Sequence, residues 1–179
     1  MGKRSDFERK GRDFYPTPYQ AVARADEMIP VRDFAEPCAG NGELMSHLYG
    51  GLGRTCVAAI DIHPLSDKVS HGSATDLMAM SDIRDKTDLI ITNPPWKFGI
   101  LSEMLDVWLA FEFEVWVLLS GDFMHNVQSS PYMKQCSDVV PVGRLKWEPK
   151  SKHTGKDNCA WYRFVPHLTV TQFHPRDRS

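Results

Sequence analysis

The chain has 179 residues, of which 42% are hydrophobic and 25% charged, a composition typical of one globular domain with a single core. The longest apolar stretch, residues 107–119, contains two glutamates and is too short to span a bilayer, and no apolar segment follows the charged N-terminus, so we expect a cytoplasmic protein without a membrane partner. The net charge of −2 excludes a uniformly basic surface, although bases gather in residues 3–12 and 144–156.

Apolar runs of strand length alternate with helical patterns along the chain. This alternation predicts an α/β fold, with a seven-stranded, mostly parallel sheet that ends in one antiparallel strand and carries helices on both faces. We expect residues 1–13 to form a flexible basic segment and residues 14–179 to form a single domain. In chain order, helices are predicted at 19–28, 43–49, 100–111 and 122–136, and strands at 31–35, 55–60, near 69, 88–92, 114–119, 139–147 and 159–165. Thr17 is the predicted N-cap of the first helix.

A glycine loop follows the first predicted strand, in the sequence Glu36-Pro-Cys-Ala-Gly40-Asn-Gly42. Two glycines at a strand–helix turn let the backbone come close to a ligand. Asp61 ends the next strand, nineteen residues after Gly42, where a carboxylate can accept hydrogen bonds from ribose hydroxyls. Met45 stands where a dinucleotide fingerprint has its third glycine. The loop therefore favours a nucleoside without a pyrophosphate, and S-adenosylmethionine over NAD.

A second motif, Asn93-Pro94-Pro95-Trp96, follows the buried-type strand at 88–92. Because proline fixes φ and lacks an N–H, this turn can hold the Asn93 side chain and the Pro94 carbonyl towards a ligand. Each acceptor can bind one hydrogen of an exocyclic aromatic amine, which draws the nitrogen towards a more nucleophilic, tetrahedral form. Trp96 offers a flat face on which a planar group can stack. A chance turn is the alternative, but the motif lies fifty-one residues beyond Gly42, after a strand.

Together these motifs resemble amino-group methyltransferases with a Rossmann-like class I fold, over about residues 14 to 120. The resemblance implies S-adenosylmethionine as the cofactor, with Glu36 facing its methionine amino group, Asp61 binding its ribose and Ile62 lying against its adenine ring. Phe14–Pro18 resembles the segment that closes over the methionine end. The cofactor residues that the resemblance implies are Tyr15, Pro16, Thr17, Glu36, Pro37, Gly40, Gly42, Asp61, Ile62, Asp76, Leu77 and Asn93.

The order and spacing of the two motifs resemble most closely those of DNA adenine-N6 methyltransferases. This implies methyl transfer to N6 of adenine in DNA, with Asn93, Pro94, Pro95 and Trp96 as the catalytic motif. The same signature occurs in RNA methyltransferases and in enzymes that methylate glutamine in release factors, so an RNA or protein substrate is an alternative. A non-catalytic cofactor-binding module is a third.

A basic segment, residues 144–158, separates the last two predicted strands. It is either a solvated hairpin tip or a loop that contacts nucleic-acid phosphates while Trp147 lies beside the target base. On the second interpretation the substrate-binding residues are Trp96, Trp147, Lys150, Lys152 and Lys156. Too little chain follows for a separate target-recognition domain, so we expect relaxed specificity, recognition of a short sequence through loops, or recognition supplied by a partner subunit or a second copy of the chain. The cysteines and histidines lack metal-ligand spacing, and we expect no metal.

Overall fold

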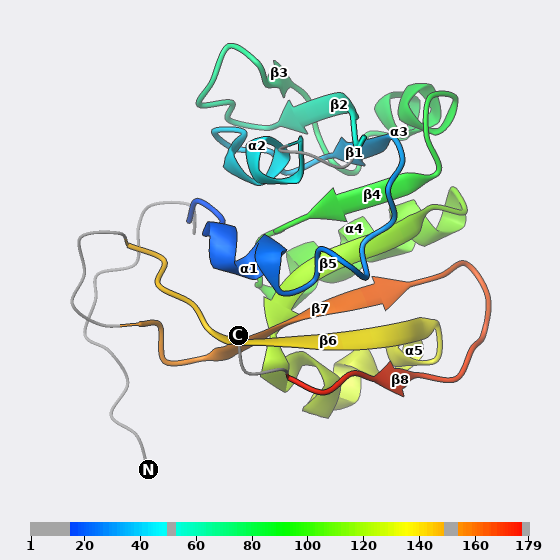
Figure 1. The fold of residues 1–179 in the computed structure, drawn as a ribbon. Helices are drawn as coiled ribbons and strands as arrows, with labels where there is room; N and C mark the ends of the chain where they lie inside the picture. The colour runs from blue at the N-terminus through cyan, green and yellow to red at the C-terminus, as the bar shows by residue number, and fades with distance from the viewer. Residues whose placement is uncertain (1–14, 50–52, 149–153, 177–179) are drawn as a thin grey trace.

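The computed structural model describes residues 15–49, 53–148 and 154–176 (Figure 1). The segment 1–13, which we expected to be flexible, lies outside this description. The helices are α1 (Tyr19–Ala23), α2 (Glu43–Tyr49), α3 (Leu77–Arg84), α4 (Phe98–Ala110) and α5 (Ser130–Met133). The strands are β1 (Phe34–Glu36), β2 (Cys56–Asp61), β3 (Ser70–His71), β4 (Leu89–Thr92), β5 (Glu114–Ser120), β6 (Cys136–Arg144), β7 (Asn158–Phe164) and β8 (Gln172–Phe173).

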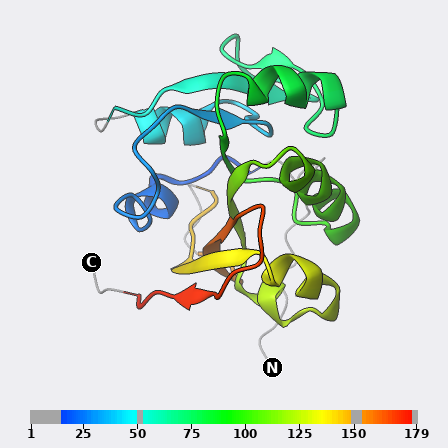
Figure 2. The same cartoon turned by 90° about the vertical axis from the view of Figure 1, so that its right-hand side faces the viewer.

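The eight strands form one sheet in the order β3-β2-β1-β4-β5-β7-β6-β8. All neighbours are parallel except β7, which runs antiparallel to both β5 and β6. Helices α1 and α2 cover one face, and α3, α4 and α5 cover the other (Figure 2). The predicted mostly parallel sheet with helices on both faces is therefore confirmed, but the antiparallel strand lies inside the sheet, between β5 and β6, and not at its end.

Each face of the sheet has its own apolar core. Alternate side chains of β4 divide between them, because successive residues of a strand point to opposite faces. Leu89 and Ile91 pack with α1 and α2, whereas Ile90 packs with α3 and α4. Trp161 is fully buried on the α1 side, where its Nε1 donates to the Ala21 carbonyl at 2.8 Å.

Several local expectations differ from the structure. Helix α3 was not predicted, and β8 is an eighth strand that the sequence pattern did not indicate. Thr17 is not the N-cap of α1; Pro18 occupies that position, without a side-chain hydrogen bond. The helix predicted at 122–136 is replaced by two short 3-10 helices, Gly121–His125 and Val127–Ser129, and by α5, in whose first turn the missing N–H of Pro131 costs nothing.

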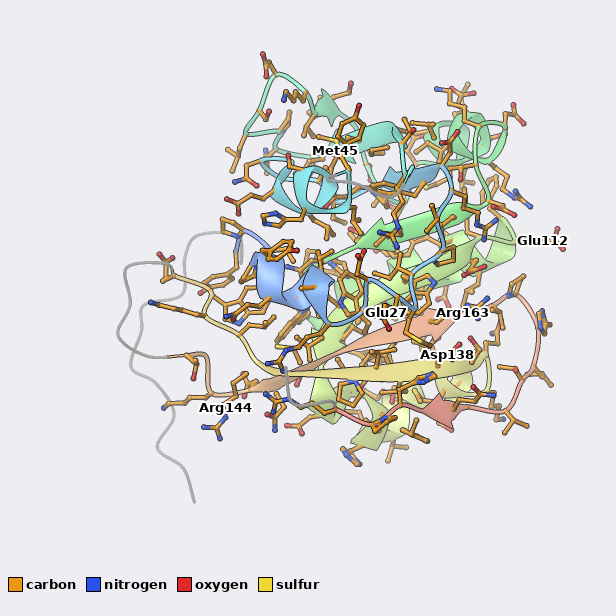
Figure 3. All side chains as sticks on the ribbon, viewed as in Figure 1. Glu27, Met45, Glu112, Asp138, Arg144 and Arg163 are labelled. Atoms are coloured by element: carbon orange, nitrogen blue, oxygen red, sulfur yellow. The ribbon has the colours of Figure 1, made fainter. Side chains whose placement is uncertain are left out.

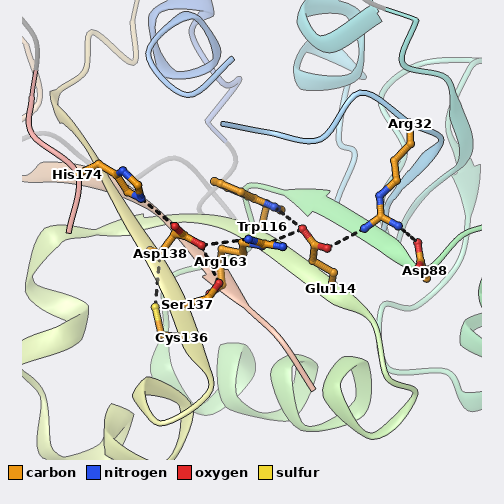
Figure 4. Close-up of polar contacts among 9 residues, drawn as sticks. All are labelled: Arg32, Asp88, Glu114, Trp116, Cys136, Ser137, Asp138, Arg163 and His174. Atoms are coloured by element: carbon orange, nitrogen blue, oxygen red, sulfur yellow. Dashed lines mark hydrogen bonds and ion pairs between the residues drawn. The ribbon is translucent and has the colours of Figure 1, made fainter. Parts of the chain in front are cut away.

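A charged network joins the strands where β4 and β5 begin (Figure 4). Arg163 on β7 binds Glu114 of β5 at 2.9 Å and Asp138 of β6 at 3.2 Å. Arg32 also binds Glu114, at 2.7 Å, and His174 Nε2 lies 2.8 Å from Asp138. The network ties the antiparallel end of the sheet to its parallel half. Within the described ranges no helix is long and apolar enough to cross a bilayer.

Candidate functional site

Residues of both sequence motifs lie together at the carboxyl ends of the central strands. Strands β2, β1 and β4 are parallel neighbours, with Glu36 beside Ala59 and Ala35 beside Ile90. Their carboxyl ends therefore lie together, and the glycine loop, Asp61 and Asn93 follow directly from those ends. Parallel sheets of this kind bind ligands in the crevice outside the carboxyl ends of their strands.

The two glycines of the loop have positive φ angles, a backbone conformation that is strained for residues with a Cβ. Gly40 has φ 51° and Gly42 has φ 78°, and a Cβ on Gly42 would lie 3.0 Å from Met45 Cε. Asp61 braces the loop, because its Oδ2 accepts from the Gly40 N–H at 2.8 Å and its Oδ1 from the His63 N–H at 2.7 Å. Our sequence reasoning missed this bracing role. Each carboxylate oxygen keeps a second lone pair for a ligand.

Glu36 is a buried acid behind this loop, with only 2% of its surface exposed. Met45, labelled in Figure 3, lies in the first turn of α2, and its N–H donates to Glu36 Oε2 at 3.1 Å. Burial raises the pKa of Glu36 well above its ordinary value; the Met45 bond lowers it, and the nearby charge of Asp61 raises it further. Among the described residues no cation forms an ion pair with Glu36. A cationic group entering here would stabilise the ionised carboxylate.

Asn93 is oriented by Thr17, a residue 76 positions earlier in the chain. The Asn93 Nδ2 group donates to Thr17 Oγ1 at 3.1 Å, and Thr17 is only 4% exposed. This bond engages the donor end of the Asn93 amide, so the acceptor Oδ1 points away from Thr17. Pro94, which follows, is buried. The turn thus holds the Asn93 side-chain oxygen Oδ1 in a fixed orientation at the carboxyl end of β4.

Three aromatic side chains gather next to this turn. Trp147 meets Trp96 edge to face with ring centroids 5.7 Å apart, and it meets Tyr15 at 6.1 Å. The Trp96 indole is fixed, because its Nε1 donates to the Leu118 carbonyl at 3.0 Å. A Cβ on Gly155 would lie 3.0 Å from Trp147 Cδ1, so the backbone just before β7 packs closely on that ring.

The structure also places most of the remaining predicted residues. Asp76 caps α3, where its Oδ1 accepts from the N–H groups of Met78 and Ala79 at 2.9 and 3.0 Å. Ile62 and Leu77 are exposed apolar side chains, at 54% and 61%. Pro16 is half-buried and Pro37 is buried, whereas Lys156 is exposed. Lys150 and Lys152 lie outside the described residues.

The cysteines offer no second chemistry. Burial raises the pKa of Cys56, Cys136 and Cys159 to about 12, and it also raises that of Cys38. The thiolate is the reactive form, so these groups stay protonated and inert at neutral pH. No cluster of three or more metal-ligating side chains occurs within the described part of the chain.

Comparison with known proteins supports the fold. No protein-family profile matches the chain, and no curated protein sequence does. A solved structure from Pyrococcus horikoshii, described as a candidate RNA methyltransferase, superposes with a TM-score of 0.55 at 16% identity over 91% of this chain and 92% of its own. A candidate class I S-adenosylmethionine-dependent methyltransferase from Listeria monocytogenes gives a TM-score of 0.47 at 7% identity, over 87% of this chain and 62% of its own. The sheet order and the Pyrococcus superposition show the Rossmann-like fold of class I methyltransferases.

Proposed function

We propose that this chain transfers a methyl group from S-adenosylmethionine to N6 of adenine in DNA. The arrangement of Asn93 is the main support. Its amide is oriented by Thr17, and it lies at the carboxyl ends of the strands beside the glycine loop. Trp96 follows after two prolines, and its indole is held by a hydrogen bond to the Leu118 carbonyl. An oriented acceptor beside a flat aromatic face is what an exocyclic amine on a planar base requires.

The residues at these strand ends fit the proposed cofactor. The buried carboxylate of Glu36 would accept hydrogen bonds from the ammonium group, and Asp61 would accept from the ribose hydroxyls. Exposed Ile62 and Leu77 would give apolar contact to the adenine ring. When bound, S-adenosylmethionine supplies an electrophilic methyl group on a sulfonium centre.

The chain's own residues would act on the other reactant. Asn93 Oδ1 and the Pro94 carbonyl would each accept one N–H of the target amine, which holds its lone pair in line for attack. The Trp96 ring would stack on the target base, and its bond to the Leu118 carbonyl fixes the ring beforehand. The methylated nitrogen is acidic and can release its proton to water. Rate enhancement would thus come mainly from positioning and oriented dipoles.

An RNA amine is the second candidate substrate, because the Pyrococcus neighbour is described as a candidate RNA methyltransferase. Tritiated methyl transfer to DNA, RNA and cell protein, followed by mass spectrometry of the labelled nucleosides, separates the two. We expect N6-methyladenine in DNA. Label confined to RNA would support the second candidate, and label on protein glutamine alone would contradict both. Recognition of a target sequence would fall to loops or to a second subunit.

A further inference from the structure

Two arginines from distant parts of the chain contact β6 near its carboxyl end, next to Arg144. Here β6 breaks its register with β7 between Pro141 and Gly143, and Gly143 has φ 82°. Arg24, which follows α1, donates from Nη1 to the Val142 carbonyl. The Arg176 guanidinium lies over Gly143, with Cζ 2.6 Å from where a Cβ of that glycine would be. Arg144 is the next residue and is exposed; Arg24, Arg144 and Arg176 form what we call the arginine cluster.

The members of the cluster lie close together along β6. Arg24 and Arg176 contact consecutive residues of this strand, Val142 and Gly143, and Arg144 follows directly. Figure 3 shows Arg144 at one end of β6, remote from Asp138 near the other end.

Arg144 and Arg176 are exposed and Arg24 is half-buried, and the cluster differs from three other arginines of the chain in its partners. Arg32, Arg54 and Arg163 each bind a carboxylate. Within residues 15–49, 53–148 and 154–176, no ion pair involves a member of the cluster. Each guanidinium carries five N–H donors, and Arg24 uses one on the Val142 carbonyl. Neighbouring guanidinium groups with unused N–H donors attract an anion and can donate hydrogen bonds to it.

The position of the cluster identifies the kind of anion. Trp147 lies three residues beyond Arg144, a span of at most about 10 Å of extended chain. Phosphates follow one another at about 3.4 Å along the axis of a nucleic-acid strand, so such a span covers about three nucleotides. Guanidinium groups beside aromatic faces suit a strand whose backbone is held while one base is stacked.

We infer that the arginine cluster binds the phosphodiester backbone of the substrate strand and thereby selects nucleic acid over protein. This inference rests on the proposed function and adds a site to it. The backbone would be held at the β6 end while the target base lies against Trp96 and Trp147. The cluster joins residues from both ends of the chain, and two of its members, Arg24 and Arg176, lie outside the basic segment that the sequence indicated.

The test compares the double variant Arg144→Gln/Arg176→Gln with Lys86→Gln/Lys134→Gln, which removes two exposed charges from the opposite edge of the sheet. Binding of fluorescent single-stranded and duplex DNA and of RNA is measured by anisotropy from about 50 to 200 mM salt. Loss of two phosphate contacts should lower the slope of log K against log salt by about 1.4 to 1.8 and weaken binding at least about tenfold at the lower salt. The control variant should bind as the parent does.

Calorimetric titration with S-adenosylmethionine keeps the two proposals separate. The arginine variant should bind this cofactor as the parent does, because β5 and β7 separate β6 from β4 and the cofactor residues at the ends of β1 and β2. An arginine variant with the parent's affinity and salt slope would overturn the inference, as would a parent that binds the cofactor but methylates only protein. A parent whose oligonucleotide binding depends on the cluster, yet which methylates no polymer, would sustain the inference and refute the proposed function.

Discussion

Replacing Thr17 by valine should disable Asn93 while leaving the shape of the site nearly unchanged. Valine fills almost the same volume as threonine but has a methyl group where Thr17 carries Oγ1. That oxygen is the acceptor for Asn93 Nδ2 at 3.1 Å, and the residue is 4% exposed, so water does not readily replace it. The Asn93 amide must then leave its donor unsatisfied or turn over.

Either outcome lowers the rate of methyl transfer. Without its Thr17 partner, holding the half-buried Asn93 amide in the reactive orientation should cost about 1–3 kcal/mol, and turning the amide over would aim its N–H groups at the N–H groups of the target amine. At about 1.36 kcal/mol for each factor of ten, kcat should fall by about 5- to 150-fold. The affinity for S-adenosylmethionine should stay close to that of the parent, because neither Glu36 nor Asp61 is touched.

Single-turnover methylation at saturating cofactor, with cofactor affinity measured by calorimetry, separates these effects. Thr17→Ser is the matched control, because serine keeps the hydroxyl acceptor, and it should recover most of the rate. A Thr17→Val enzyme that loses cofactor affinity but keeps its saturated rate would show that Thr17 is a cofactor ligand and does not position Asn93.

Substitutions at three further residues test the rest of the site. Cofactor affinity should strengthen as pH rises through the raised pKa of Glu36, since a cation binds the ionised carboxylate; Glu36→Gln should weaken binding by about 10- to 150-fold and remove the pH dependence in calorimetry. Asp61→Ala should cost about 1–3 kcal/mol of cofactor binding, and an unchanged dissociation constant would exclude it as the ribose ligand. Trp96→Ala should weaken substrate capture by about 1–3 kcal/mol while Trp96→Phe retains most activity; equal losses in both would argue against stacking.

Features encoded in short sequence segments were predicted from the sequence. The strand–glycine–helix turn around Gly40 needs positive φ, which glycine supplies, and α2 begins and ends where the pattern indicates. The Asn93-Pro94-Pro95-Trp96 turn is stiffened by its own prolines. In both cases the physical reason lies within a few residues, so local sequence sufficed.

Features that depend on distant contacts were not predicted. Thr17 was expected to cap a helix, but its hydroxyl accepts from Asn93 across 76 residues of sequence. The two-residue β8 exists because its backbone pairs with β6, and its own sequence has too short a pattern to indicate a strand. The arginine cluster likewise depends on a contact between Arg24 and Val142, 118 residues apart.

The central claim is that Asn93 activates an amine, and the single-turnover rate of Asn93→Ala tests it most directly. The substitution leaves Glu36, Asp61 and the glycine loop in place but removes the oriented acceptor. We predict a rate at least about a hundredfold below that of the parent, equivalent to about 2.7–4 kcal/mol for one preorganised polar group, with cofactor binding retained. If Asn93→Ala methylated as fast as the parent, the proposed amine activation would be wrong even though the fold is that of a class I methyltransferase.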